Sequence, residues 1–464
     1  MYNSNITKAF VKIIGLLGEF DGERISEFEN ELHRDEFSED IGPSSYKKFD
    51  SLTKEKREKH LKDVFYPDFR ELLFVSTPKN KMKREEVLSR RFLKSFDSEL
   101  YFIDRDREKP TVIKQSLKFK VVKSEIFLFA QQIGLFALTL ELCDDKLTDE
   151  SIRDLIFFSR NFDSLVSLDG SNNTEYWHEL ISNNFISKIK LVGENVKADE
   201  YSGSKFKTYT VIDTDVSQEN RSAYLYDMGT ASRIGSAKGN QYSSPNPDYF
   251  SELMKNKISI FNNWEALCLF DSFTCVGNKV LIDSKEEDEF FKKSNWEYTY
   301  FRVYLFRLFF KYNLYRYNSD LHDNTVKLRN QFEKFLNNYN LSHISFNFLP
   351  NEIFNKIGEA LHLDEELNTF QSRINRISSA IQEEKQSRTN ALLQFVSVLG
   401  GLGSVMPVFD GLSLAQKYLG WSNGVFYTLL VLILLSLGLV VLAFLMPEQV
   451  KKLRKKMFKK KTDL

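Results

Sequence analysis

The sequence of 464 residues is poor in cysteine and proline. Its three cysteines, Cys143, Cys268 and Cys275, are too few and too widely spaced for a disulfide framework or a zinc module, and they fit a reducing compartment. Nine prolines argue against a linker-rich chain. Hydrophobic residues make up 42% of the chain, which excludes global disorder, because that much apolar surface supports a packed core. At about 100–200 residues per domain, the length allows roughly two to four domains.

Recognisable catalytic signatures are also missing. The sequence contains no HExxH, GxSxG, Walker A or Cys-x-x-Cys pattern, and its six histidines are isolated from one another. We therefore predict that the protein is not an enzyme and that binding, rather than turnover, is the activity of the larger part of the chain.

The formal net charge is zero, from 64 basic and 64 acidic residues, but the charges are unevenly distributed. The last 14 residues contain eight basic and one acidic residue, which leaves 56 basic and 63 acidic residues in the preceding 450. A body with a net charge of −7 is a poor general binder of nucleic acid, because the phosphate backbone repels it. We expect no direct nucleic-acid binding.

Two long stretches near the C-terminus carry no charged residue. Residues 425–446 form a run of 22 that is followed by the basic tail, and residues 391–409 form a run of 19. About 20 apolar residues cross the hydrocarbon core of a bilayer as a helix. Because basic residues favour the cytoplasmic side, the sequence predicts a multi-pass protein of the inner (plasma) membrane with two C-terminal transmembrane helices and both termini in the cytoplasm. The alternatives are a buried core helix for the former run and a re-entrant or soluble segment for the latter.

A polar stripe runs along the predicted first span and the helix before it. Its positions recur at alternating steps of three and four residues, which places them on one side of a helix. At the span they are Asn390, Gln394, Ser397, Gly401 and Ser404. Because polar groups in lipid need a partner or water, the stripe predicts a pore that several copies of this helix line in a homo-oligomer. The alternative is close helix packing through Gly401 and Ser404, without a pore.

The chain divides into four predicted regions. They are a charged, helical region (1–90), an α+β (mixed α/β) cytosolic ligand-binding domain (91–285), long stalk helices (286–389) and two transmembrane helices with a basic cytoplasmic tail (390–464). Strands of the mixed domain are predicted at 124–142, 206–213, 221–228 and 258–277. Thr148 is the predicted N-cap of a helix that follows the first of these.

The segment 295–321 is rich in aromatic residues and long enough to suggest a third span. Its interior contains Arg302, Arg307, Lys311 and Arg316, and four cations inside a lipid-exposed helix are unfavourable. We therefore predict a stalk helix here.

One loop combines glycine with positive charge. Residues 229–240, GTASRIGSAKGN, contain three glycines and the cations Arg233 and Lys238, and they follow a predicted strand. Backbone N–H groups freed by glycine, together with nearby cations, can bind phosphate oxygens, and Tyr224 and Tyr226 could stack on a base. The spacing matches no named phosphate loop, so a solvated flexible loop is the alternative.

The order of a cytosolic mixed domain, stalk helices, two C-terminal spans and a KKLRKK-type tail resembles the CorA-type divalent-cation channel superfamily, most closely over residues 295–464. That family forms homopentamers whose first span lines the pore and ends in a Gly-Met-Asn tripeptide. Residues 403–411 read GSVMPVFDG here, so the tripeptide is missing. In this the chain resembles the divergent CorA-like membrane effectors of type III CRISPR systems.

The resemblance implies a homopentameric membrane channel of antiviral defence, which a nucleotide second messenger gates by binding the cytosolic domain. The expected messengers are a cyclic oligoadenylate or an S-adenosylmethionine–AMP conjugate, and a divalent cation is a further candidate ligand. Two alternatives stay open. One is a divalent-cation (Mg²⁺-type) transporter with an altered filter, and the other is a non-conducting membrane-anchored scaffold.

Overall fold

The computed structural model divides into two compact units, Met1–Gln371 and Ser372–Leu464. The structure describes residues 2, 4–19, 38–39, 59, 61–74, 89–106, 108, 112–129, 133–143, 146–185, 205–239, 244–278, 280–281, 295–319, 325–403, 406–420, 422, 424–425, 427–428 and 431–432.

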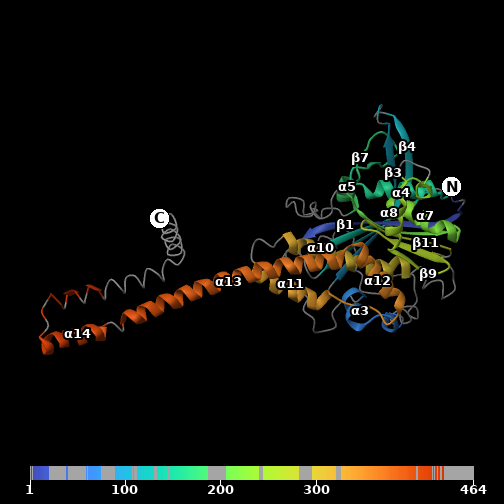
Figure 1. Ribbon diagram of the computed structural model, residues 1–464. Coiled ribbons are helices and arrows are strands. Elements are labelled where there is room, and N and C mark those ends of the chain that lie inside the picture. The colour runs from blue at the N-terminus through green and yellow to red at the C-terminus, as the bar shows by residue number, and fades with distance from the viewer. Residues whose placement is uncertain are drawn as a thin grey trace, which may run out of the picture. The chain divides into compact units, whose positions relative to one another are not determined.

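One large sheet organises the first unit (Figure 1). Its strands are β1 (Ile6–Glu19), β2 (Ser38–Glu39), β3 (Ser89–Arg105), β4 (Ile113–Phe129), β5 (Ile133–Leu142), β6 (Leu165–Ser167), β7 (Glu175–Tyr176), β8 (Lys207–Thr214), β9 (Lys257–Phe261), β10 (Trp264–Cys268) and β11 (Ser272–Gly277). Their order is β7-β6-β3-β4-β5-β1-β8-β11-β10-β9, and β2 pairs with β3. β8 and β11 run parallel, so the chain must cross over between them, whereas β1 is antiparallel to both β5 and β8.

The helices lie on both faces of this sheet and in the second unit. They are α3 (Pro67–Phe74), α4 (Asp149–Arg160), α5 (Trp177–Leu180), α7 (Gln218–Thr230), α8 (Pro247–Met254), α10 (Phe301–Ser319), α11 (Thr325–Tyr339), α12 (Phe348–Ala360), α13 (Leu363–Gly403) and α14 (Met406–Leu419). Shorter turns are the π-helical η3 (Ile181–Phe185) and η5 (Asn295–Tyr300) and the 3₁₀ turn η4 (Ser236–Lys238).

The two faces of the sheet carry different side chains because neighbouring strand positions point in opposite directions. The Tyr209 ring of β8 packs against Phe301 of α10, with 5.2 Å between the ring centres. On the other face, the Ser272 hydroxyl of β11 donates to the Gly229 carbonyl of α7 at 2.7 Å. The sheet therefore lies between α7 on one side and α10 on the other (Figure 1).

The predicted start of α4 is confirmed. The Thr148 hydroxyl accepts a hydrogen bond from the Ser151 N–H at 3.1 Å, and the Ser151 hydroxyl accepts one from the Thr148 N–H at 3.0 Å. This reciprocal capping box satisfies two of the backbone donors that a helix leaves free at its first turn.

The strand predicted at 221–228 is wrong, because these residues lie in α7. Tyr224, Leu225 and Met228 are all fully buried. Their spacing of one and three residues matches a single helix face, and a short aromatic run does not distinguish that pattern from a strand.

The helical region predicted over 1–90 is also corrected where the structure describes it. Residues 6–19 form β1, which lies between β5 and β8. Val11, Ile13, Ile14 and Leu17 are fully buried, and a run that is apolar at odd and even positions is typical of a strand covered on both faces. Most of residues 20–58 lie outside the described part of the chain.

The predicted transmembrane helices are contradicted. Among the described residues, which reach the end of α14 and only fragments beyond it, no helix is long and apolar enough to cross a membrane. The two C-terminal spans, the multi-pass inner-membrane placement and the membrane-channel class are corrected accordingly. The helix over the first predicted span ends at Gly403, and α14 carries Asp410 and Lys417. Residues 433–446 of the second predicted span lie outside the described residues.

Candidate functional site

The loop after α7 has an unusual backbone. Ala231 follows the helix with φ 56°, and Gly235 and Gly239 flank η4 with φ 88° and 84°. Glycine adopts this left-handed region freely, whereas alanine is strained there. The surrounding contacts must therefore hold residues 229–239 in one conformation.

Asp227, in the last turns of α7, fixes the conformation of this loop. Its carboxylate is fully buried and accepts hydrogen bonds from the Tyr2 hydroxyl at 2.6 Å, the Gly235 N–H at 2.6 Å and the Ala237 N–H at 3.0 Å. The loop amides that were predicted to receive phosphate are thus already bound to an internal carboxylate. The interpretation that this loop offers free N–H groups is wrong for Gly235 and Ala237.

The pKa values of Asp227 and Tyr2 follow from the burial of both side chains. Burial raises the pKa of the Asp227 carboxyl, and the hydrogen bonds from Tyr2, Ala237 and Gly235 lower it in part. Burial and the neighbouring Asp227 carboxylate raise the pKa of the Tyr2 phenol, so Tyr2 stays a donor at neutral pH. A neutral phenol and a carboxylate make a stable pair here.

The two predicted cations lie on the outer side of this loop. Arg233 and Lys238 are both exposed, and the Lys238 ammonium lies 4.5 Å from the centre of the Tyr2 ring. An exposed guanidinium and ammonium within six residues of a fixed loop can both contact one anionic group.

The two predicted base-stacking tyrosines do not present a free face. Tyr224 is fully buried, and its hydroxyl donates to Asp149 at 2.9 Å while its ring meets Tyr2 edge to face at 5.1 Å. Tyr226 is buried against Phe250, with 5.6 Å between the ring centres. Both are core residues, so stacking on a ligand base is not their role.

Sequence reasoning missed Tyr2 and Asp227, which build the site. They are 225 positions apart, and no local pattern connects them. Asp227 carried one usable signal, because it is an acidic residue just before a glycine-rich loop, where a carboxylate can cap backbone amides.

The turn between β10 and β11 lies against the start of the loop. The Ser272 hydroxyl binds the Gly229 carbonyl at 2.7 Å, and the Arg160 guanidinium donates to the Thr230 carbonyl at 3.3 Å. The Lys207 ammonium contacts Asp271 of the turn at 2.6 Å. No pattern in the sequence connects these residues with the loop.

The predicted pore-lining residues lie on α13. Asn390, Gln394 and Ser397 are exposed, and the Ser397 hydroxyl donates to the Leu393 carbonyl at 2.8 Å. Gly401 lies in the last turn of α13, and Ser404 lies outside the described residues. Asn390, Gln394 and Ser397 share one side of the helix, and the described part of α13 is not long and apolar enough to cross a membrane.

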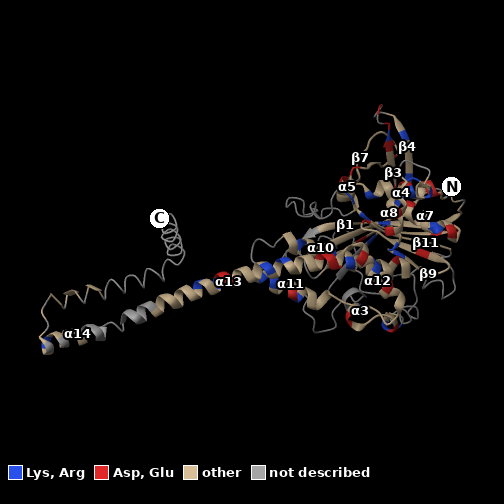
Figure 2. Ribbon diagram, viewed as in Figure 1, with Lys and Arg blue, Asp and Glu red and all other residues tan. Residues whose placement is uncertain are grey.

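The rest of the circumference of the same helix segment is apolar. Leu392, Leu393, Phe395 and Val396 have exposed fractions between 48% and 64%. Figure 2 shows that charged residues are spaced along the first part of α13, and the sequence places none after Arg388 in this helix. Residues 390–397 are therefore amphipathic and carry an uncovered apolar face.

Among the described residues, no group of three or more histidine, cysteine, aspartate or glutamate side chains is arranged to hold a metal ion. The divalent cation implied by the resemblance therefore stays a prediction.

Comparison with known proteins finds no match for this chain among protein-family models, curated proteins or solved structures.

Proposed function

We propose that the first unit is a non-enzymatic sensor that binds a phosphate-bearing ligand of the adenylate type on the outer side of loop 229–239. The observation that carries the proposal is the pair of exposed cations, Arg233 and Lys238, on a loop that the buried Asp227 fixes from within. Rigid presentation reduces the entropy lost when a ligand is bound.

The ligand contacts in this proposal are side-chain contacts. A charge-assisted hydrogen bond contributes about 1.5–3 kcal/mol, so two of them support micromolar binding when other contacts add to them. A cyclic oligoadenylate or an S-adenosylmethionine–AMP conjugate carries both the phosphate and a base.

An exposed aromatic residue near the loop is the candidate to contact the base. Tyr249 of α8 is exposed. Burial is the main cause that raises the pKa of the Tyr226 phenol, and the nearby Tyr249 raises it further. Its ring, unlike those of Tyr224 and Tyr226, is open to a ligand, and aromatic rings bind the faces of bases in a sequence-tolerant way.

Calorimetric titration of the full chain with these adenylates tests the proposal. Arg233→Ala/Lys238→Ala should weaken binding at least tenfold for each cation removed, because each contributes about 1.5–3 kcal/mol. The matched control is Lys255→Ala directly after α8, an exposed lysine whose ion pair with Glu252 is also exposed. If the double variant binds as tightly as the parent, the site is elsewhere, and if the parent binds none of the adenylates, the sensor function is rejected.

Self-association through α13 is a second candidate function. It rests on the exposed apolar face of Leu392, Leu393, Phe395 and Val396, which a second copy of the same helix would cover. The expected homo-oligomer agrees with the sequence prediction of several copies, without the pore.

Sedimentation of the full chain decides this candidate. Phe395→Glu should shift the protein to a monomer, whereas Asn390→Glu, a charge of the same kind on the polar side, should leave the oligomer intact. A parent that sediments as a monomer, or an equal effect of both variants, contradicts association through this face.

A further inference from the structure

Two strained helix ends stand out in the described chain. Ala231 after α7 has φ 56° and His362 after α12 has φ 54°, and they are the described non-glycine residues with positive φ. Side chains are disfavoured in this region, and such strain persists only where surrounding contacts impose it. Ala231 begins the candidate ligand loop, and His362 is the corner before α13.

The turn at residues 269–272 contacts the first of these ends. The Ser272 hydroxyl donates to the Gly229 carbonyl at 2.7 Å. The neighbouring Thr230 carbonyl accepts from Arg160 at 3.3 Å, and Asp271 lies near enough to Arg160 to stabilise its charge. The turn thus holds the last residues of α7 directly and through Arg160.

The same turn contacts the second strained end through Phe270. The Lys311 ammonium lies 4.8 Å from the centre of the Phe270 ring, and the His362 ring lies 6.5 Å from it. Lys311 is buried and donates to the Leu361 carbonyl at 2.7 Å and to the Glu366 carboxylate. One lysine therefore binds the chain on both sides of the His362 corner.

Lys207 completes the connection from the sheet side. Its ammonium lies 4.1 Å from the centre of the Phe270 ring and binds Asp271 at 2.6 Å. Two ammonium groups thus contact one ring, and each is held by a carboxylate. A shift of the turn must change the cation–π contacts of both lysines together, because the ring and Asp271 are neighbours in the same turn.

We propose that the 269–272 turn couples the conformation of loop 229–239 to the α12–α13 corner, so that ligand binding at the loop changes the order of the first turns of α13. The direction from the ligand rests on the proposed sensor function, but the coupling itself exists in the free protein. The element with two states is the corner at His362, which either keeps its strained backbone or relaxes when Lys311 loses its position over Phe270.

Hydrogen exchange of the full chain without ligand tests the coupling. Asp227→Asn replaces one of the two carboxylate oxygens that accept from the Tyr2 hydroxyl and the two loop amides, so amides at 235–239 should exchange at least tenfold faster. Amides at 361–370 should then exchange at least fivefold faster as well. The matched control is Asp169→Asn, because the Asp169 carboxylate also fixes a turn by accepting from a hydroxyl, that of Ser167 at 2.9 Å, and from a backbone amide, that of Ser171 at 2.9 Å. It should loosen only its own turn.

A second substitution tests the route. With Phe270→Leu added to Asp227→Asn, the loop should still exchange faster while the amides at 361–370 return to within twofold of the Phe270→Leu single variant. If the corner is unaffected by Asp227→Asn, or if it responds equally with and without Phe270, the coupling through this turn is rejected.

Two safeguards keep the test decisive. If Asp227→Asn does not fold, Tyr2→Phe keeps the buried ring and removes one of the three donors to the Asp227 carboxylate, and faster exchange at 361–370, or its absence where the loop itself exchanges faster, decides. Because no ligand is present, failure of the adenylate titration rejects the sensor function and leaves the coupling standing, whereas an unresponsive corner rejects the coupling alone.

Discussion

The helices α10 and α13 show opposite relations between composition and burial. α10 contains Arg302, Arg307 and Lys311 and is nevertheless largely buried, whereas α13 exposes Leu393 and Phe395. The cations of α10 are accommodated by ring faces: Arg302 lies 4.2 Å from the centre of the Tyr298 ring. A charged helix can therefore be core when aromatic rings and carbonyls meet its cations, and an apolar helix face need not be covered within one chain.

The largest difference in stability between the two helices is expected when one phenylalanine in each is replaced. Phe309 of α10 is fully buried and stacks on Phe129 of β4 at 4.6 Å, so Phe309→Ala should lower the free energy of unfolding by about 3–5 kcal/mol. Phe395→Ala in α13 removes a ring that is exposed within one chain, so in the monomer it should change this free energy by less than about 0.5 kcal/mol. Urea denaturation of the full chain, at a concentration at which it sediments as a monomer, measures both, and equal losses would show that the α13 face is covered within one chain.

The sequence predicted part of this arrangement for physical reasons. The cations of α10 argued against a membrane span, because four cations in the interior of a helix are unfavourable in lipid. The cap at Thr148 was predictable because it depends on residues within one turn. The strand β8 was predictable because it consists mainly of β-branched and aromatic residues, which favour strands.

The rest depended on contacts between distant residues. Tyr2 and Asp227 meet only in the folded chain, and so do Phe270 and Lys311. The burial of Tyr224 follows from α7 being a helix, which its short aromatic run did not reveal. The charges of loop 229–239 were therefore visible in the sequence, but the contacts that hold its backbone were not.

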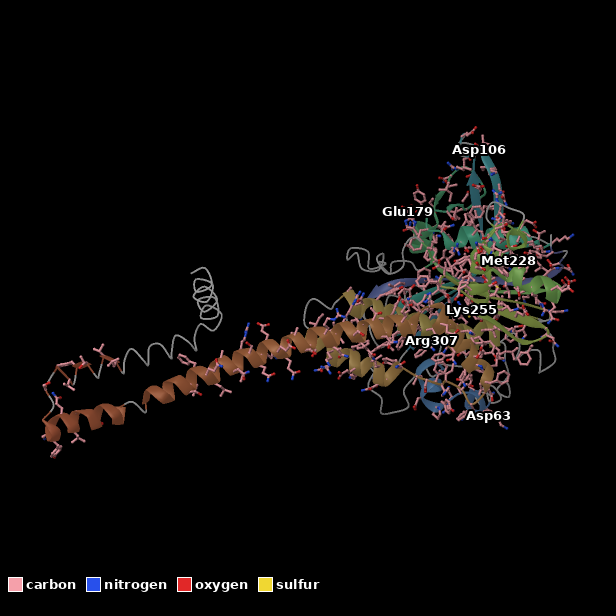
Figure 3. The ribbon with its side chains drawn as sticks, in the orientation of Figure 1. Asp63, Asp106, Glu179, Met228, Lys255 and Arg307 are labelled. Atoms are coloured by element: carbon pink, nitrogen blue, oxygen red, sulfur yellow. The ribbon has the colours of Figure 1, made fainter. Side chains whose placement is uncertain are left out.

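An intermediate effect is expected from the partly buried Arg307, labelled in Figure 3. Its guanidinium donates to the Phe354 carbonyl at 3.0 Å and lies 3.3 Å from the centre of the Phe354 ring. Arg307→Met keeps the apolar stem but removes the charge-assisted hydrogen bond to this carbonyl, so the free energy of unfolding should fall by about 1.5–3 kcal/mol.

The control for Arg307 comes from α13. Arg388 forms an exposed ion pair with Glu384 at 2.6 Å, and such pairs contribute about 0.5 kcal/mol or less. Arg388→Met should therefore have little effect on urea denaturation. If Arg307→Met is equally mild, the cations of α10 are tolerated rather than used, and the contrast between the helices weakens.

The smallest effect concerns the charge of Lys311. Burial lowers the pKa of its ammonium, and the Glu366 carboxylate offsets part of that shift. Between the lowered value and the ordinary value of 10.5, the unfolded chain binds the proton more tightly, so the stability contributed by this lysine rises with pH across that alkaline window. The difference in unfolding free energy between the parent and Lys311→Met should therefore shift in favour of the parent from pH 7 to pH 10. Measurement should stop there, because Tyr315 has a raised pKa and acts in the opposite direction once phenols in the unfolded chain ionise. Lys334→Met, at an exposed position of α11, should show no such trend, and a pH-independent difference for Lys311→Met would mean that its ammonium is as well solvated in the fold as in the unfolded chain.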